Sequence, residues 1–275
     1  MTGRILRKLV VYAVLVVFVV VAVYPVFWMF TCALKTRAEV SRDKWGLPES
    51  WAWENFHRVV FEHRFARYIL NSGIVTVSAV LVTLVAAALA GFVFARTRFR
   101  GRSFLFYVFL GGMMIPVHIV LIPLLKIFGF LRLADTHAAL VMSYVAFSLP
   151  VSIFILRGFF EGVPAELEEA ARIDGCSAAG VFWHVMLPLA RPALAVVTIF
   201  NFVTLWNEFI FALTLLNSDR LFTIPLGMFE FYEEYSIQIP LVCAALSISV
   251  LPMLVLYFFA QKHIIRGLTS GALKG

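Results

Sequence analysis

The chain has 275 residues, of which 62% are hydrophobic and 14% are charged, and its formal net charge at pH 7 is +7. Soluble globular proteins are about half apolar and about a quarter charged, so this composition excludes an ordinary soluble domain and predicts a membrane protein. The basic residues lie between apolar runs and form no continuous stripe, so we expect them to face anionic membrane lipids and expect no nucleic-acid partner.

The apolar runs predict an all-α, polytopic membrane protein. A spanning helix takes about 20 mostly apolar residues. Six segments reach this length, at 9–31, 69–95, 104–125, 137–157, 189–216 and 241–260. Arg4, Arg7 and Lys8 precede the first segment, as in a signal peptide. Its apolar run is too long for one and no small-residue cleavage site follows, so we expect a retained anchor.

Basic residues predict the orientation, because cytoplasmic loops of membrane proteins are enriched in Lys and Arg. The turn between the second and third segments contains four arginines and no acidic residue: Arg96, Arg98, Arg100 and Arg102. The first outer loop, 32–68, is also basic, but acidic residues partly offset its charge. We therefore expect both termini in the cytoplasm.

The predicted organisation has three parts. Residues 1–68 form the N-terminal anchor and the first outer loop, and residues 69–260 form the core transmembrane domain, with a cytoplasmic loop at 158–188. Residues 261–275 form a Gly-rich cytoplasmic tail, which is either a frayed terminus or a segment that contacts a partner.

The cytoplasmic loop carries clear local helix signals. Pro164 suits the first position of a helix, and the acidic residues that follow it complement the positive end of the helix dipole. Gly175 can adopt the left-handed conformation that ends a helix. Ser177 is a typical N-cap for a second helix, which we expect to run to His184 and to stop ahead of the following Leu-Pro pair.

The first helix of this loop is short and therefore marginal in water on its own. We expect its apolar residues to lie on one surface and its acidic residues on another. These apolar residues are Leu167, Ala170, Ala171 and Ile173. The hairpin either lies on lipid headgroups or docks onto a protein. An acidic helix against an anionic leaflet is unfavourable, so the sequence favours a protein partner.

The fifth segment contains four polar or aromatic residues that are candidates for lining a pathway: Asn201, Trp206, Asn207 and Glu208. An intramembrane acid is costly and usually faces the bundle interior or a pathway. Glu208 either lines such a pathway or stabilises a subunit interface through hydrogen bonds, and we favour the structural role.

The outer loop at 217–240 is acidic and rich in aromatic residues, which are Phe222, Phe229, Phe231, Tyr232 and Tyr235. Exposed aromatic side chains at this density predict contact with another surface. The alternative is an aromatic belt at the membrane interface.

Several kinds of chemistry find no support in the sequence. The six histidines lack paired ligand spacing, and Cys32, Cys176 and Cys243 form no CxxC pair, so we expect no metal site and no disulfide framework. There is no phosphate-binding G-x-x-x-x-G-K-[ST] motif and no nucleophile elbow. An ion-coupled secondary transporter would need several intramembrane ionisable residues, and only Glu208 lies deep in a segment.

One set of motifs in this order is similar to the EAA loop of bacterial ABC-importer permeases: Glu169-Ala170-Ala171, Asp174-Gly175, Phe182, and Leu187-Pro188 with Pro192. Further matches resemble the carbohydrate-uptake (maltose-type) branch of this binding-protein-dependent family: Ile115-Pro116, Ile122-Pro123, Leu156-Arg157-Gly158-Phe159-Phe160, Trp206-Asn207-Glu208 and the tail from Arg266 to Gly275.

The resemblance implies a type I importer permease fold, a location in the plasma (inner) membrane of a bacterium or archaeon, and a complex of several chains. In that family two different permeases associate with two copies of a cytoplasmic ATPase, and an extracytoplasmic binding protein delivers the solute. The implied solute is a sugar or oligosaccharide, with glycerol 3-phosphate or a polyol as the alternative.

The resemblance also implies which residues face the ATPase and where ATP binds. The implied coupling residues are Glu168, Glu169, Ala170, Ala171, Asp174, Gly175, Phe182 and Pro188. ATP and Mg²⁺ would be bound by the ATPase, so this chain is expected to be a transport subunit that binds no cofactor and catalyses no reaction.

Overall fold

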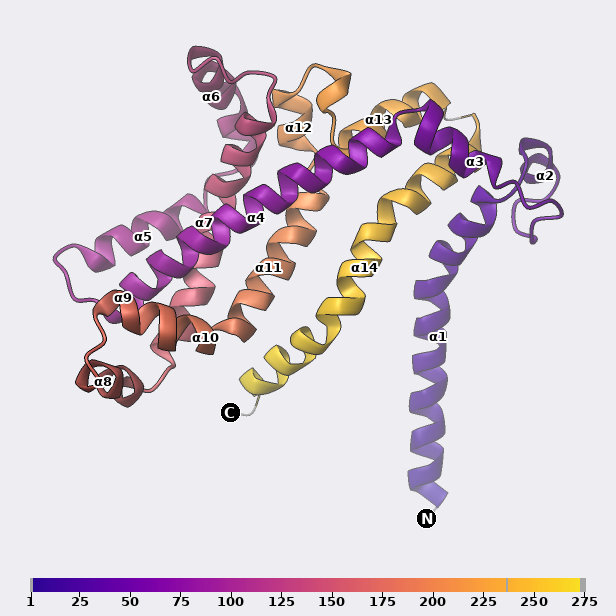
Figure 1. The fold of residues 1–275 in the computed structure, drawn as a ribbon. Coiled ribbons are helices and arrows are strands. Elements are labelled where there is room, and N and C mark those ends of the chain that lie inside the picture. The colour runs from indigo at the N-terminus through magenta and orange to yellow at the C-terminus, as the bar shows by residue number, and fades with distance from the viewer. Residues whose placement is uncertain (1, 236, 273–275) are drawn as a thin grey trace. The chain divides into compact units, whose positions relative to one another are not determined.

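The computed structural model describes residues 2–235 and 237–272, with side chains described for 4–235 and 237–258. Throughout the described residues the regular structure is helical (Figure 1). The helices are α1 (Thr2–Ala33), α2 (Arg37–Arg42), α3 (Glu54–His57), α4 (Phe65–Arg96), α5 (Arg102–Gly112), α6 (Val117–Phe130), α7 (His137–Glu161), α8 (Ala165–Ile173), α9 (Ala178–Val181), α10 (Leu187–Leu189), α11 (Arg191–Trp206), α12 (Ile210–Leu215), α13 (Ile224–Tyr235) and α14 (Ile239–Ala272). Short π or 3₁₀ turns occupy Arg58–Glu62, Phe182–Met186 and Asp219–Leu221.

Four helical stretches are long and apolar enough to cross a membrane: Arg4–Ala33, Phe65–Arg96, His137–Glu161 and Ile239–Phe258. Two further spans arise if each of two bent helix pairs is counted as one, with bends of 99° between α5 and α6 and 72° between the α9–α10 stretch and α11. The all-α polytopic prediction is therefore confirmed, with up to six spans among the described residues.

Two of the spans predicted as single segments are interrupted in the structure. The segment predicted at 104–125 is interrupted between Gly112 and Val117, where Pro116 takes an extended conformation ahead of α6. Proline lacks an amide hydrogen and disfavours a helical residue before it, which explains why the helix stops there. The segment predicted at 189–216 is interrupted at Asn207–Phe209, between α11 and α12.

The chain divides into two compact units, one of Met1–Ala66 with Gly227–Pro252 and one of Arg67–Leu226 with Met253–Gly275. The first boundary lies close to the predicted one at 68/69. The sequence did not predict that residues 227–252 would pack with the N-terminal part. Most of the predicted tail at 261–275 lies in the helical course of α14 up to Ala272, and its side chains lie outside the described residues.

In the first unit, the outer loop is tied to the end of α1 by polar contacts. Lys35 is buried and donates to the Asp43 carbonyl at 2.9 Å. Asn55 donates to the carbonyls of Ala33 and Lys35 at 2.8 and 3.0 Å. The buried charge is therefore matched by a carbonyl acceptor, which limits the cost of removing it from water.

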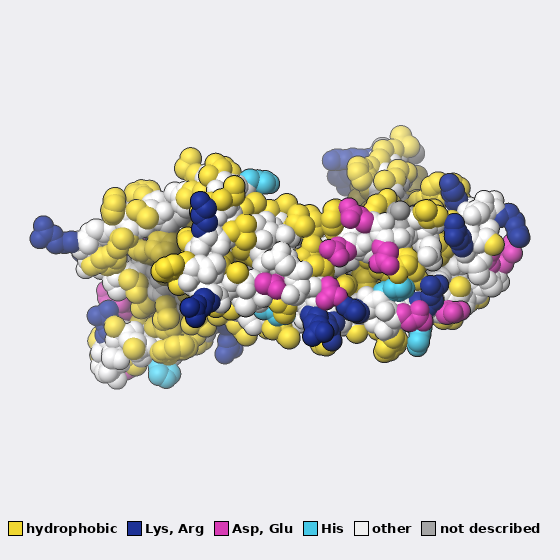
Figure 2. Space-filling view, turned by 90° about the horizontal axis from the view of Figure 1, so that it is seen from above, with side chains coloured by type: hydrophobic (Ala, Val, Ile, Leu, Met, Phe, Trp, Pro, Cys, Tyr) yellow, Lys and Arg dark blue, Asp and Glu magenta, His cyan; other side chains and the backbone are white. Residues whose placement is uncertain are grey.

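The aromatic residues of the loop at 217–240 divide between core and surface, contrary to the prediction that all are exposed. Phe222 and Phe231 are buried, whereas Phe229 and Tyr232 are exposed. Phe231 packs edge-on against Phe65 with ring centroids 5.2 Å apart. Seen from above, acidic side chains gather over α13 (Figure 2). The surface of α13 thus combines acidic side chains with only part of the predicted aromatic set.

The second unit contains a continuous apolar cluster where α4, α7 and α9–α11 pack together. Helices α4 and α7 approach closely at Gly91, where an added Cβ would lie 3.1 Å from both the Arg157 nitrogen and the Leu156 Cβ. The sequence therefore uses glycine on α4 where the backbone of α7 comes nearest. This cluster supports the loop at 158–188.

Candidate functional site

The loop at 158–188 begins with α8, which is a short helix with matched ends. Pro164 lies one residue ahead of the first helical residue, so the predicted start is displaced by a single position. At the other end Gly175 has φ = +85°, in the left-handed region. The Gly175 amide donates to the Arg172 carbonyl at 3.1 Å, and the Cys176 amide donates to the Ala171 carbonyl at 2.9 Å. These two bonds form a Schellman motif, which confirms the predicted glycine stop.

The second helical stretch of the loop starts as predicted but continues further. The Ser177 hydroxyl accepts a hydrogen bond from the Gly180 amide at 3.2 Å, as an N-cap does. The helical course then passes through a π turn and continues to Leu189, so the predicted end at His184 is wrong. In the π turn the Leu187 amide donates to the Phe182 carbonyl, and this wider turn leads into the proline that was expected to stop the helix.

Aromatic and apolar side chains attach this loop to the helices of the second unit. Phe182 is buried, and its ring lies 5.2 Å from that of Phe92 on α4. The Phe92 ring also meets Phe160 of α7 edge-on at 5.9 Å. Ala171 and Met186 are buried in the same cluster. The predicted coupling residues Phe182 and Ala171 therefore lie inside the protein, where they hold the loop in place.

Most of α8 is exposed, and apolar and charged side chains share its surface. Ile173 is 86% exposed and Leu167 is 43% exposed, and Ala170 lies on the surface with them. The prediction that all four apolar residues share one surface is wrong for Ala171, which turns toward the core. Large exposed apolar side chains beside a solvated loop are typical of a surface that another protein covers.

The predicted coupling residues separate into two groups. Glu169, Asp174, Gly175 and Pro188 are exposed. Within the described part of the chain, Glu169 has no ion pair or hydrogen bond to its side chain. It is therefore available to a partner, whereas Glu168 is not.

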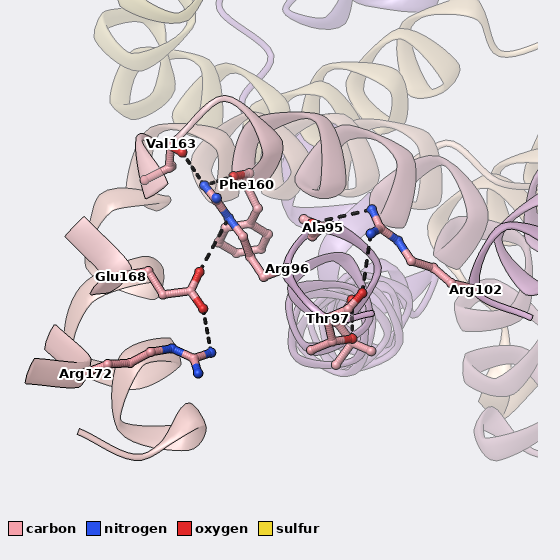
Figure 3. A network of polar contacts seen from close by, with 9 residues as sticks. Ala95, Arg96, Thr97, Arg102, Phe160, Val163, Glu168 and Arg172 are labelled. Carbon is pink, nitrogen blue, oxygen red and sulfur yellow. Dashed lines mark hydrogen bonds and ion pairs between the residues drawn. The ribbon is translucent and has the colours of Figure 1, made fainter. Parts of the chain in front are cut away.

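Glu168 is instead held by two arginines (Figure 3). Its Oε1 accepts from Arg172 at 2.8 Å, and its Oε2 lies 4.0 Å from the Arg96 Nε. The side chains of Arg96 and Glu168 are only 12% and 13% exposed. The Arg96 Nη2 also donates to the Phe160 carbonyl at 2.6 Å and to the Val163 carbonyl. Arg96 thus connects the end of α4, the end of α7 and α8.

A second basic cluster lies beside this one. Arg157 and Arg102 both pair with Glu161, at 2.8 and 3.4 Å, and the Arg157 guanidinium lies 3.8 Å from the centre of the Phe106 ring. An open hollow of about 480 Å³ is lined by residues of α8, the end of α4 and the start of α5. Its lining includes four arginines, Arg96, Arg98, Arg102 and Arg172, together with Glu168 and Glu169.

The four pathway candidates have structural contacts of different kinds. Asn201 is buried and donates to the Ser152 hydroxyl at 2.9 Å. Trp206 is buried and stacks on Phe202 with ring centroids 5.3 Å apart. Asn207 is exposed and donates to the Val203 carbonyl at 2.8 Å.

Glu208 lies in the break between α11 and α12. Its carboxylate accepts from the amides of Phe211 and Ala212 at 2.7 and 3.3 Å, and from the Tyr144 hydroxyl at 2.8 Å. All three hydrogen bonds are internal to the chain, so the carboxylate binds two amides in the first turn of α12 and links this helix to α7. The role of Glu208 at a pathway or a subunit interface stays a prediction.

Sequence reasoning predicted no contact between Arg96 and α8, and it missed Tyr144 and Ser152. Arg96 lies in the last turn of α4, but nothing in the local sequence connects it with the acidic residues of α8 about 70 positions later. Among the described residues no group of three or more His, Cys, Asp or Glu side chains is arranged to hold a metal ion.

A polytopic helical chain with a structured loop that exposes Ile173 and a Glu169 unpaired within the described chain has the features of a membrane subunit of a larger complex. The chain belongs to the family described as binding-protein-dependent transport system inner membrane component, whose model matches residues 83–270. It is therefore a permease subunit of a binding-protein-dependent ABC importer, as the motifs of the loop predicted.

The chain is similar over nearly its full length to named permeases. It is 42% identical to a putative ABC transporter permease protein, ORF2, of Caldicellulosiruptor sp. (strain Rt8B.4), covering 95% of each chain. It is 34% identical to the diacetylchitobiose uptake system permease protein NgcG of Streptomyces coelicolor, covering 96% of this chain and 88% of the relative.

A solved structure also matches the fold. It is the crystal structure of a bacterial ABC transporter involved in the import of the acidic polysaccharide alginate, with a TM-score of 0.80 and 25% sequence identity. The match covers 95% of this chain and 98% of the other. The type I importer permease fold is therefore confirmed.

Proposed function

We propose that this permease imports a sugar or oligosaccharide, as one half of a heterodimer with a second permease. Its relatives support the solute class, because one is named for diacetylchitobiose uptake and the matched solved structure is described as importing alginate. In this proposal an extracytoplasmic binding protein delivers the solute, and two copies of a cytoplasmic ATPase bind ATP and Mg²⁺.

The observation that carries the proposal is the outward side of α8. Ile173 and Leu167 are exposed there, and Glu169 is free of partners within the described chain. We assign this surface to the ATPase, with Glu169 pairing with a basic group across the interface. The loop that contains α8 is attached to the membrane helices, because Ala171 and Phe182 are both buried in the apolar cluster of the second unit.

The proposed orientation places both termini and the loop at 158–188 in the cytoplasm. The arginines at the end of α4 support it, because they lie in the same unit as α8 and line the hollow beside it. Residues 217–240 then lie outside, where the acidic surface of α13 is available to the binding protein.

The test uses charge reversal on α8 in the complex purified with its operon partners. We expect Glu169→Lys to leave the protein inserted but to uncouple ATP hydrolysis from uptake, because a buried interface charge would then meet a like charge. Glu49→Lys is the matched control, since Glu49 forms only an exposed surface pair with Arg42. Wild-type uptake by Glu169→Lys would refute the assignment of α8 to the ATPase.

A ligand screen on the copurified binding protein tests the solute class separately. We expect sugars or oligosaccharides to raise its melting temperature, because ligands that bind only the native state stabilise it. Stabilisation by glycerol 3-phosphate or a polyol alone would replace the proposed solute class and leave the role of α8 intact.

A further inference from the structure

Arg96 joins three segments that are separate in the chain. It is the last residue of α4, and its Nη2 donates to the Phe160 carbonyl in the last turn of α7 and to the Val163 carbonyl just beyond it. Its Nε makes no hydrogen bond to the described residues and forms an ion pair at 4.0 Å with the Glu168 carboxylate on α8 (Figure 3). The residues Arg96, Phe160, Val163 and Glu168 are called the Arg96 network below.

The chemistry of these contacts suits arginine in particular. The last carbonyls of a helix lack intrahelical partners, and a cation near them also interacts favourably with the helix dipole. A planar guanidinium has five donors in a fixed fork, so it can bind carbonyls and face a carboxylate at the same time. Because the Arg96 side chain is only 12% exposed, water competes little for these contacts.

Few other polar contacts join α8 to the rest of the chain. Ala171 is the one buried residue of α8, and a single methyl group provides little resistance to sliding. The other arginine on Glu168 is Arg172, which belongs to α8 itself and is 59% exposed. The Arg96 network therefore provides the polar contacts that connect α8 to the ends of α4 and α7.

We infer that Arg96 is a positioning residue that makes α8 move as one body with the ends of α4 and α7 when the ATPase displaces it. This rests on the proposed docking of the ATPase on α8. It also reassigns Glu168, which holds the helix to its own chain, while Glu169 faces the partner. Coupling then depends on an arginine that the ATPase does not touch.

The test measures amide hydrogen exchange in the complete complex in nanodiscs, with and without ATP, Mg²⁺ and vanadate, so no solute is needed. Peptides covering 165–173 report on α8, and peptides covering 85–96 report on the end of α4. Arg96→Gln removes the positive charge and the planar guanidinium donors, and Arg98→Gln is the matched control. Arg98 is exposed, lies two residues away, and has no hydrogen bond or ion pair among those of the described chain.

In the wild type and in Arg98→Gln we expect the nucleotide to change exchange in both peptides. In Arg96→Gln we expect the response of 165–173 to persist, while the response of 85–96 falls about fivefold or more and basal exchange of 160–170 rises about tenfold. An unchanged response of 85–96 in Arg96→Gln would overturn the inference. No response of 165–173 in the wild type would instead overturn the docking of the ATPase on α8.

Two further variants address folding and chemistry. Arg96→Lys keeps the positive charge but loses the planar set of guanidinium donors. We therefore expect its exchange response at 85–96 to lie between those of the wild type and Arg96→Gln. Arg96→Lys is measured in place of Arg96→Gln if the latter fails to assemble. Swapping the charges as Arg96→Glu with Glu168→Arg restores an ion pair but removes the donor to the two carbonyls. We expect the swap to remain defective, and full recovery would show that the charge pair alone is responsible.

Discussion

The end of α8 offers a graded test of how the loop keeps its shape. Gly175 has φ = +85°, and a Cβ placed there would meet no heavy atom within 4 Å. The cost of replacing it is therefore a backbone cost and not a steric clash. For an L residue the left-handed conformation costs about 1–2 kcal/mol, and asparagine tolerates it better than alanine.

These magnitudes predict an order among three substitutions. Gly175→Asn is expected to be the mildest, and Gly175→Ala is expected to cost about 1 kcal/mol, which raises local opening about fivefold. Gly175→Pro is expected to cost about 3 kcal/mol or more, because proline cannot adopt this φ and removes the amide that donates to the Arg172 carbonyl at 3.1 Å. Coupling between ATP hydrolysis and uptake should fall in the same order, with Gly175→Pro inserted but uncoupled.

Hydrogen exchange of the Cys176 amide measures the effect directly, since this amide closes the Schellman motif at 2.9 Å. Gly180→Ala is the matched control, because Gly180 is inside a helical stretch. A Cβ added at Gly180 would lie 3.4 Å from its nearest neighbour, the Cys176 Cβ, which is an ordinary contact distance. It should leave exchange unchanged or slow it, as Gly to Ala in a helix is favourable by about 1 kcal/mol. Equal effects of Gly175→Ala and Gly180→Ala would refute the argument from backbone conformation.

Three other predictions follow from contacts elsewhere. Tyr144→Phe and Glu208→Gln should each lower the free energy of unfolding in detergent by about 1–3 kcal/mol. Because the two side chains are joined by a 2.8 Å hydrogen bond, the double variant should lose much less than the sum of the two single effects. Additive effects would mean that this hydrogen bond contributes nothing. Gly91→Ala should destabilise the protein by about 1–3 kcal/mol in the same assay, because the backbone of α7 blocks a Cβ there, whereas Gly73→Ala, with open space, should not. Hydrogen bonds from the amides of residues 36 and 50 lower the pKa of Glu39 from 4.5 to about 2, so its stabilising effect should be complete above pH 4.5 and be lost as the pH falls toward 2. Proteolysis of the outer loop against pH should show this loss in the wild type and not in Glu39→Gln.

The sequence by itself determined the class of fold and the nature of the coupling loop. Long apolar runs have no alternative to helices in a bilayer, because every backbone polar group must be satisfied within the segment. The glycine at 175 and the serine at 177 act on their immediate neighbours, so their roles as helix stop and helix cap could be predicted from local chemistry.

Only the tertiary structure decided which side of α8 is free and what each charge does. The periodicity of Ala171 and Ile173 does not say which one faces the core, because that depends on where Phe92 and Phe182 pack. Glu168 and Glu169 are alike in sequence, and they differ only because Arg96 arrives from a helix that ends about 70 residues earlier in the chain. Contacts between distant segments set these roles, so no local pattern could have assigned them.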